Sequence, residues 1–309
     1  MNSVKRRLVV SVALAAFTAM GFVATASAAP ADGLPEQVRA LAATVEVLRA
    51  VAALQQKSID ELRRSNDVLV KKLKCVSSSS GDVDVIFEGC NVHVLNGVGQ
   101  TSTTNGRGNL IIGYNKNEVS TRAGSHNLIV GDLHEYSSYG GIVSGTENTL
   151  SAPNATVLSS VDSEARTVSG TILGADRGIT DTAAVIVGGT RNYAGPGANF
   201  GVVVGGTENA TNGARAVAVG GTLNNAAGGN AVACGGSENS AVGSEAMVCG
   251  GSSNVSNGLD SSISGGSHNT ANGRASSVSG GWTNTADGDY SSILGGNGNT
   301  VGAIYGTSP

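Results

Sequence analysis

The chain has 309 residues, of which 46 are glycine, 14% are charged and 4% are aromatic. The glycines lack the three-residue period of collagen, which excludes a collagen triple helix. The formal net charge is −4, and a weakly acidic, aromatic-poor surface is a poor match for a phosphate backbone, so we expect no nucleic-acid binding. Few large side chains predict a thin core, which repeat proteins tolerate because burial adds up from unit to unit.

The N-terminus has the organisation of an export signal. We expect residues 1–28 to be a signal peptide and residues 29–34 a linker. The alternative is an uncleaved membrane anchor, for which the apolar run is short. No later segment looks like a transmembrane helix, so we expect an exported protein that is extracellular or at the cell surface or outer envelope. The basic stretch, apolar run and small-x-small cleavage site are Lys5-Arg6-Arg7, Leu8–Val23 and Ala26-Ser27-Ala28.

Residues 35–75 predict a coiled-coil stalk. Two sets of residues recur every seven positions, which is the a and d pattern of a heptad repeat. Polar residues at two of these positions set the register, and the pattern does not settle two strands against three. The alternative is one amphipathic helix packing on its own domain. The a positions are Val38, Val45, Ala52, Ile59, Asn66 and Leu73, and the d positions are Leu41, Leu48, Gln55, Leu62 and Leu69.

Residues 76–104 are expected to join the helix to the repeats. The Ser- and Gly-rich stretch Ser77–Asp82 ends the helix. Val83–Phe87 and Asn91–Leu95 alternate like short β-strands. We expect these two strands to cap the first repeat.

The four cysteines fall into two pairs. Cys75 and Cys90 flank the junction, whereas Cys234 and Cys249 occupy the same position in adjacent repeats. Stacked strands lie about 4.8 Å apart, within the Cα separation that a disulfide accepts. The second pair therefore fits either a disulfide or two free thiols that replace Val as small apolar residues. The sequence leaves the disulfide state of all four open.

Residues 105–305 carry repeats, followed by a short tail at 306–309. Each regular copy has a Gly-Gly pair and an Asn four positions after the first Gly. The step is 17 residues at first and 15 from Gly205 onward. A fixed short period predicts one unit stacked on copies of itself. The first glycines are Gly188, Gly205, Gly220, Gly235, Gly250, Gly265, Gly280 and Gly295, and the asparagines are Asn192, Asn209, Asn224, Asn239, Asn254, Asn269, Asn284 and Asn299.

Residues 276–288 illustrate the predicted rung. Val278 lies at the centre of one short strand, and Gly280-Gly281 forms a turn that larger residues would obstruct. Thr285-Ala286 suits a second strand with Ala facing inward. We expect Asn284 to stack on the Asn of neighbouring rungs and to pass amide hydrogen bonds along the ladder. The result is a flat, two-sheeted coil whose interior strands are paired on both sides.

The strand before each Gly-Gly pair is apolar on both faces from residue 185 to residue 249. The residues two positions before the first Gly of each pair fill the inside of the coil. Because side chains alternate along a strand, the residues one and three positions before that Gly point outward. An outward apolar face must be covered. Because a coiled coil precedes the repeats, the simplest cover is an identical coil from another chain. The outward residues are Val185, Val187, Val202, Val204, Val217, Val219, Val232, Cys234, Met247 and Cys249.

The segments Ala216–Gly220 and Ala231–Gly235 read Ala-Val-Ala-Val-Gly and Ala-Val-Ala-Cys-Gly. They resemble the repeat of the heads of YadA-like trimeric autotransporter adhesins, which carry Hep/Hag-type β-roll repeats. The resemblance covers roughly residues 105–305. It implies an all-β solenoid, namely a left-handed parallel β-roll, that forms a homotrimer on a bacterial surface and serves attachment.

Two features differ from that family. The predicted coiled coil precedes the repeats, whereas the family places its head before its stalk. The family ends in a membrane-embedded barrel anchor, and the sequence reaches Pro309 without one. A secreted, envelope-associated or appendage-tip location therefore stays open.

Candidate metal ligands are few. His126, Asp132, His134 and Glu135 form a cluster, and Asp132 and His134 would share one face of a strand. They match no ligand motif, so we interpret them as a polar loop after Gly131. A calcium β-roll needs Asp after the glycines, where this chain has mostly Thr or Ser. We expect no metal, no cofactor and no catalytic residues.

Other residues suggest surfaces for a ligand. A column of hydroxyl side chains suits ice or a repetitive glycan, although we favour hydroxyls that bond the turn. Trp282 interrupts this column, either as a contact residue or packed over the turn. The insertion Tyr193–Gly197 is the best loop for a ligand. The column consists of Thr190, Thr207, Thr222, Ser237, Ser252 and Ser267.

The sequence thus favours a non-enzymatic, exported, adhesin-like structural protein. Its expected partners are copies of itself and an extracellular matrix, glycan or other surface ligand that the sequence does not identify. One alternative is a β-helical polysaccharide-active enzyme, for which Asp176, Arg177 and Asp181 form a sparse candidate cluster. The other is an ice- or glycan-binding solenoid.

Overall fold

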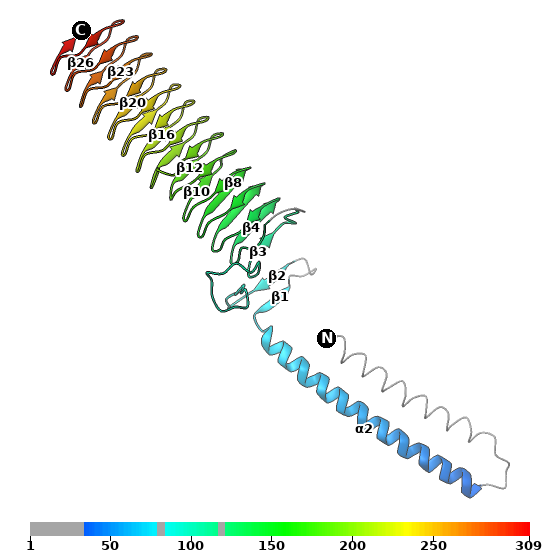
Figure 1. The fold of residues 1–309 in the computed structure, drawn as a ribbon. Coiled ribbons are helices and arrows are strands. Elements are labelled where there is room, and N and C mark those ends of the chain that lie inside the picture. The colour runs from blue at the N-terminus through cyan, green and yellow to red at the C-terminus, as the bar shows by residue number, and fades with distance from the viewer. Residues whose placement is uncertain (1–33, 79–83, 117–120) are drawn as a thin grey trace. The chain divides into compact units, whose positions relative to one another are not determined.

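The computed structural model describes residues 34–78, 84–116 and 121–309. The chain divides into two compact units, residues 1–92 and residues 93–309. The described part of the first unit contains a helix and a two-stranded sheet, and the second unit is a parallel β-solenoid (Figure 1). The expected signal peptide, and all but the last residue of the expected linker, lie outside the described residues.

Helix α2 (Leu34–Lys72) confirms the helix predicted from the heptad pattern. Glu36 in its first turn and Lys71 and Lys72 in its last turn match the helix dipole. Its d residues Leu41 and Leu62 are 65% and 62% exposed, so the apolar stripe is open in the single chain. Nowhere in the described ranges is a helix both long and apolar enough to span a membrane.

The junction forms a hairpin that the sequence predicts only in part. β2 (Val85–Phe87) lies in the expected strand, and it pairs antiparallel with β1 (Val76–Ser78). A disulfide between Cys75 and Cys90, with the Cα atoms 6.0 Å apart, closes this hairpin. The expected strand at Asn91–Leu95 is wrong, because these residues form no strand in the described structure. β2 already pairs with β1. An alternation of apolar and polar residues does not by itself give residues 91–95 a strand to pair with.

Two parallel sheets build the solenoid. One has 14 strands and is here called the first sheet, and the other has 12 strands and is called the second sheet. Successive rungs add one strand to each, and the rungs stack along one axis (Figure 1). The first sheet contains β3 (Leu110–Ile112), β4 (Leu128–Asp132), β6 (Ile142–Thr146), β8 (Thr156–Val161), β10 (Thr171–Leu173), β12 (Val185–Val187), β14 (Val202–Val204), β16 (Val217–Val219), β18 (Val232–Cys234), β20 (Met247–Cys249), β22 (Ser262–Ile263), β24 (Ser277–Val278), β26 (Ser292–Ile293) and β28 (Thr307–Ser308). The second sheet contains β5 (Glu135–Tyr136), β7 (Thr149–Leu150), β9 (Glu164–Ala165), β11 (Ile179–Thr180), β13 (Tyr193–Ala194), β15 (Ala210–Thr211), β17 (Asn225–Ala226), β19 (Ser240–Ala241), β21 (Val255–Ser256), β23 (Thr270–Ala271), β25 (Thr285–Ala286) and β27 (Thr300–Val301).

The core is thin, as the composition predicts. The first sheet contributes the column two positions before each first Gly, and every one of these residues is buried. The second sheet contributes mostly Ala, such as Ala271 and Ala286, which are fully buried. In most rungs the first sheet supplies a Val or Ile and the second a smaller side chain, whereas at Ala218 and Ala233 the first sheet also supplies only a methyl group. The buried column of the first sheet is Ile186, Val203, Ala218, Ala233, Val248, Ile263, Val278 and Ile293.

A buried asparagine ladder runs beside this core. The backbone N–H of each Asn from Asn209 to Asn299 donates to the Oδ1 of the Asn in the preceding rung, at 2.9–3.1 Å. The expected amide-to-amide bonds are rarer: Asn254 and Asn269 make them, each at 3.2 Å. The Nδ2 group instead reaches backbone carbonyls. Asn239 Nδ2 donates to Gly235 in its own rung and to Gly251 in the next, both at 3.1 Å.

The two glycines of each turn have different reasons to be glycine. Gly266 has a φ of +83°, and a Cβ there would lie 2.3 Å from the carbonyl oxygen of Gly281. Gly265 lies outside the positive-φ region, and a Cβ there would meet open space. The second glycine is therefore required by conformation and by the close approach of the next rung, whereas the first glycine of this rung is required by neither.

This difference predicts the effect of two neighbouring substitutions. Gly266→Ala should lower the free energy of unfolding by roughly 3 kcal/mol or more, since it adds backbone strain to a steric clash. Gly265→Ala should leave it unchanged or raise it by about 0.5–1 kcal/mol, because it restricts the unfolded chain. Urea denaturation followed by circular dichroism measures both. Equal effects of the two variants would contradict this account of the turn.

The ladder predicts a second contrast. Asn239→Ala removes the acceptor of the Asn254 N–H and the donor to two glycine carbonyls, and should cost about 2–4 kcal/mol of unfolding free energy. Asn257→Ala is the control, because exposed Asn257 donates only across the surface to Asn272, at 2.8 Å. That variant should stay within about 0.5 kcal/mol of wild type. A small loss for Asn239→Ala would show that the ladder is not a main source of stability.

Candidate functional site

His134 belongs to the ladder and not to a ligand cluster. Its ring is fully buried and occupies the position of the ladder Asn, in register with Asn148. The Nδ1 atom accepts the backbone N–H of Asn148 at 3.3 Å, so the proton lies on Nε2, which donates to the Val130 carbonyl at 3.0 Å. The backbone N–H of His134 donates to Asn115 Oδ1 at 2.7 Å. The sequence held a signal, because His134 follows Gly131 at the same distance as Asn148 follows Gly145.

The other members of the expected cluster point to separate partners. His126 Nδ1 lies 3.2 Å from the carbonyl oxygen of Thr101, and Asp132 accepts the backbone N–H groups of Leu133 and Lys116. Leu133 has a φ of +61°, so the chain turns between β4 and β5, and the continuous strand that would place Asp132 and His134 on one face is not formed. Across residues 34–78, 84–116 and 121–309, no three His, Cys, Asp or Glu side chains are placed to hold a metal ion.

Burial gives His134 a pH-dependent role in stability. Desolvation lowers its pKa below the ordinary 6.5, although backbone hydrogen bonds and the charge of Asp132 act in the opposite direction. The unfolded chain then binds the proton first as the pH falls. The contribution of His134 to stability is therefore complete above about pH 6.5 and is lost as the pH falls toward the lowered pKa.

We expect His134→Asn to remove this pH dependence, because Asn is the usual residue of the ladder. The measurement is the free energy of unfolding of wild type and variant between about pH 7.5 and pH 5.5. Wild type should lose more stability than the variant across this window. Exposed His268 is the control, and His268→Asn should follow wild type. A variant that loses as much stability as wild type would contradict a neutral, buried His134.

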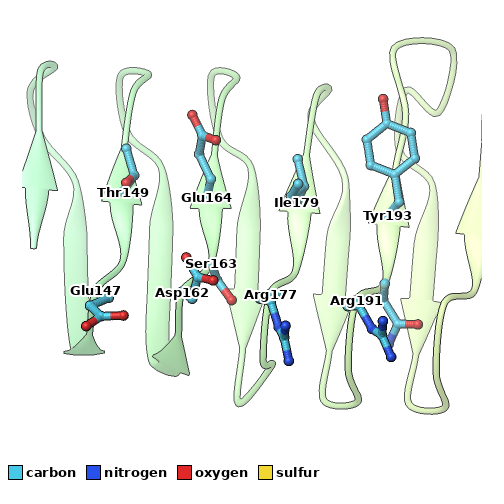
Figure 2. A pocket seen from close by; sticks show the side chains of 10 residues that line it. Glu147, Thr149, Asp162, Ser163, Glu164, Arg177, Ile179, Arg191 and Tyr193 are labelled. Carbon is cyan, nitrogen blue, oxygen red and sulfur yellow. The ribbon is translucent and has the colours of Figure 1, made fainter.

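A shallow groove of about 440 Å³ lies on the outer face of the second sheet. Two rows of side chains line it, one from the first residue of each strand and one from the turn residue two positions earlier (Figure 2). Both rows come from β7, β9, β11 and β13 and the turns before them, where unlike residues occupy equivalent positions. The strand row is Thr149, Glu164, Ile179 and Tyr193, and the turn row is Glu147, Asp162, Arg177 and Arg191.

The turn row of the groove changes sign along the stack. Two acidic residues are followed by two arginines, and all four have a positive φ of 48–58° that turns the side chain out of the coil. Arg177 lies 3.4 Å from Asp176, and Arg191 lies 2.9 Å from Glu208 in the next rung. These exposed pairs are worth little stability. Because these ion pairs are weak, the charged side chains of the turn row stay available to polar ligands.

The strand row continues into a hydrogen-bonded network. Arg166 lies 2.7 Å from Glu164 and 3.5 Å from Asp181, and the hydroxyl of Tyr193 donates to Asp181 at 2.5 Å. The hydrogen bond to Glu164 raises the pKa of Arg166, and the hydrogen bond to Asp181 raises the pKa of Tyr193. The network fixes Tyr193 at the end of the groove, with polar groups on one side of its ring.

The candidate catalytic cluster is not assembled as one site. Asp176 pairs with Arg177, whereas Asp181 is held by Arg166 and Tyr193. Glu164, the second carboxylate of this network, pairs with the same arginine as Asp181 does, namely Arg166. Arg–carboxylate pairs of this kind position side chains, while general acid–base catalysis needs a carboxyl group aimed at a reacting atom.

The hydroxyl column lies outward, and its residues join adjacent rungs through parallel bridges. Ser237 Oγ donates to Ser252 Oγ at 3.2 Å, and Ser267 Oγ lies 2.7 Å from His268 Nδ1. Ser237 thus bonds a hydroxyl of the next rung, whereas Ser267 contacts the following residue of its own turn. Trp282 in the same column is 54% exposed, which favours the interpretation as a contact residue over one packed on the turn.

The 17-residue rung carries its extra residues after the second strand. Tyr193 and Ala194 form β13, in register with Ala210 and Thr211. The chain then needs two more residues than the next rung before it enters β14, so the insertion lies at 195–201 and not at Tyr193 itself. This loop rises beyond Tyr193 at one end of the groove (Figure 2). Phe200 in it is 71% exposed.

The outer face of the first sheet is the second candidate surface. Val187, Val204 and Val219 are each 38% exposed and lie in register in neighbouring strands. Their flat column continues to Cys234 and Cys249, which are free thiols. From β22 onward the same face carries mostly serine, such as Ser264 and Ser279, with exposed Leu294 in the same column. The face therefore has an apolar part and a hydroxyl part.

No family model matches the chain, and no curated protein matches it. The resemblance to adhesin heads thus rests on the repeat motifs themselves.

Proposed function

We propose that the protein is an exported, non-catalytic structural protein of a bacterial surface that assembles as a trimer and serves attachment. The observation that carries the proposal is the apolar outer face of the first sheet over residues 185–249. Three of its valines alone are 38% exposed each, in one straight column. Contiguous apolar patches of this kind mark protein–protein interfaces.

Helix α2 supports the same assembly. Its a and d residues form an exposed stripe, with Val38 at 60% and Leu48 at 55% exposure. A stripe with this period is buried when helices supercoil around one another. A parallel coiled coil would bring several solenoids together through equivalent faces, which is the geometry that a symmetric homo-oligomer needs. The left-handed β-roll and the trimer belong to the family that the repeats resemble.

The groove on the second sheet is the surface that we propose for the ligand. It remains open when the opposite sheet is covered, because the two sheets face opposite sides of the coil. Its charged turn row, Tyr193 and the loop at 195–201 offer polar contacts and aromatic surface. These contacts suit a glycan or a protein surface of the extracellular matrix, and the separate pairing of Asp176 and Asp181 favours binding over catalysis.

Charges placed on the apolar column test the assembly. Val204→Glu with Val219→Glu should shift the trimer toward monomers as the protein is diluted, because carboxylates would then be buried without partners and α2 alone would hold the chains together. The matched control is Ser264→Glu with Ser279→Glu, which adds the same charges at equivalent exposed positions of the serine-bearing rungs. Multi-angle light scattering gives the masses of the purified proteins. A monomeric wild type, or a double-Val variant that stays trimeric, would contradict the proposal.

A further inference from the structure

Three sulfur-bearing side chains gather at one place on the outer face of the first sheet. The chain has four Cys and three Met in all. Cys75 and Cys90 are joined in a disulfide. Of the sulfur residues beyond the junction, Cys234, Met247 and Cys249 are all that the sequence contains, and they fall on two neighbouring strands.

The register of the strands places the three on the same side. Cys234 in β18 is the direct partner of Cys249 in β20. Met247 lies two residues before Cys249, so alternation points both side chains outward, away from buried Val248. Neighbouring strands lie about 4.8 Å apart. The long thioether of Met247, with three rotatable bonds, lies diagonally across from Cys234 and can reach the gap between the thiols.

The two thiols already interact. Both are free, and they are direct partners on neighbouring strands. Cys249 is exposed, Cys234 is half-buried and Met247 is 40% exposed, so the three are open to a small ion in the single chain. Their neighbours in the same columns are Val219 and Val232 on one side and the hydroxyl residues Ser262 and Ser264 on the other, so sulfur is the only strong donor type in this cluster.

We propose that Cys234, Cys249 and Met247 form a binding site for a soft monovalent cation, Cu(I). Thiolate and thioether sulfur are the ligands that select Cu(I). Zinc prefers four tetrahedral ligands, and the described residues place no further His, Cys, Asp or Glu beside these two thiols to form such a set. The site uses side chains of one chain, at the last apolar rung before the serines begin.

Binding exchanges protons for metal. Two thiols and one Cu(I) give a bis-thiolate complex with a net charge of −1 and release two protons, while the Met247 thioether donates an electron pair without losing a proton. No electron is transferred. Affinity should therefore rise with pH, because each ligand thiol must be deprotonated.

The test is an anaerobic competition titration of the full purified chain with the Cu(I)–bicinchoninate complex. Ascorbate keeps the copper reduced without opening the Cys75–Cys90 disulfide. The complex is offered to the folded protein and during refolding, so that a site covered by other copies is also reached. We expect one Cu(I) per chain, with apparent affinity that increases from pH 6 to pH 8.

The variants assign the ligands. Cys234→Ser and Cys249→Ser should each abolish stoichiometric binding, and serine is tolerated at this column in later rungs. Met247→Leu should weaken binding by about tenfold or more while keeping the volume. Val232→Leu, on the same face but without sulfur, is the control and should bind as wild type does.

Three results would overturn the site. They are no transfer of Cu(I) from bicinchoninate in either protocol, equal binding by wild type and by a Cys234→Ser, Cys249→Ser double variant, or an intact Cys234–Cys249 disulfide in the isolated protein. Because the ligands come from one chain, a monomeric protein that binds one Cu(I) would contradict the proposed trimer and leave this site standing.

Discussion

Each asparagine of the ladder satisfies backbone groups that the thin coil would otherwise bury without partners. Asn224, for example, accepts the N–H of Asn239 and donates to carbonyls of its own rung and of the next. A buried polar group left unpaired costs about 1–3 kcal/mol, which a core built largely from Val and Ala cannot offset many times over. The ladder therefore fixes the register between neighbouring rungs, because an Asn displaced by one residue would lose its partners above and below; the 17-residue rung keeps this register by placing its extra residues in a loop.

The sequence predicts the solenoid and its core well, because a strict period reports the stacking directly. Val278, Ala286 and the column of small residues around them are buried as alternation requires. The less regular rungs are harder. His134 looks like a metal ligand when it is considered alone, and its place in the ladder becomes evident only when Glu135 is set in register with Thr149. The hairpin of β1 and β2 was missed in part because the stretch after Cys75 resembles a helix breaker.

The groove was beyond prediction for a related reason. Its residues lie 14 or 15 positions apart and belong to no local motif, so Glu164, Ile179 and Tyr193 become neighbours only through the strand register. The two broad faces of the solenoid then carry different chemistry. The first sheet offers an apolar column and, at its end, three sulfur atoms, whereas the second sheet offers charges and an aromatic ring. This division suits a protein that uses one side to assemble and the other to bind.

Hydrogen–deuterium exchange, resolved to single amides by NMR or by overlapping peptides, tests the stacked ladder most directly. The account predicts slow exchange at the ladder amides from Asn209 to Asn284, recurring every 15 residues, and also at exposed turn residues such as Glu238 and Asp260, whose backbone N–H groups donate to carbonyls of the preceding rung. Uniformly fast exchange through residues 185–301 would contradict it, because backbone amides held by the rung above cannot exchange freely while the stack is intact.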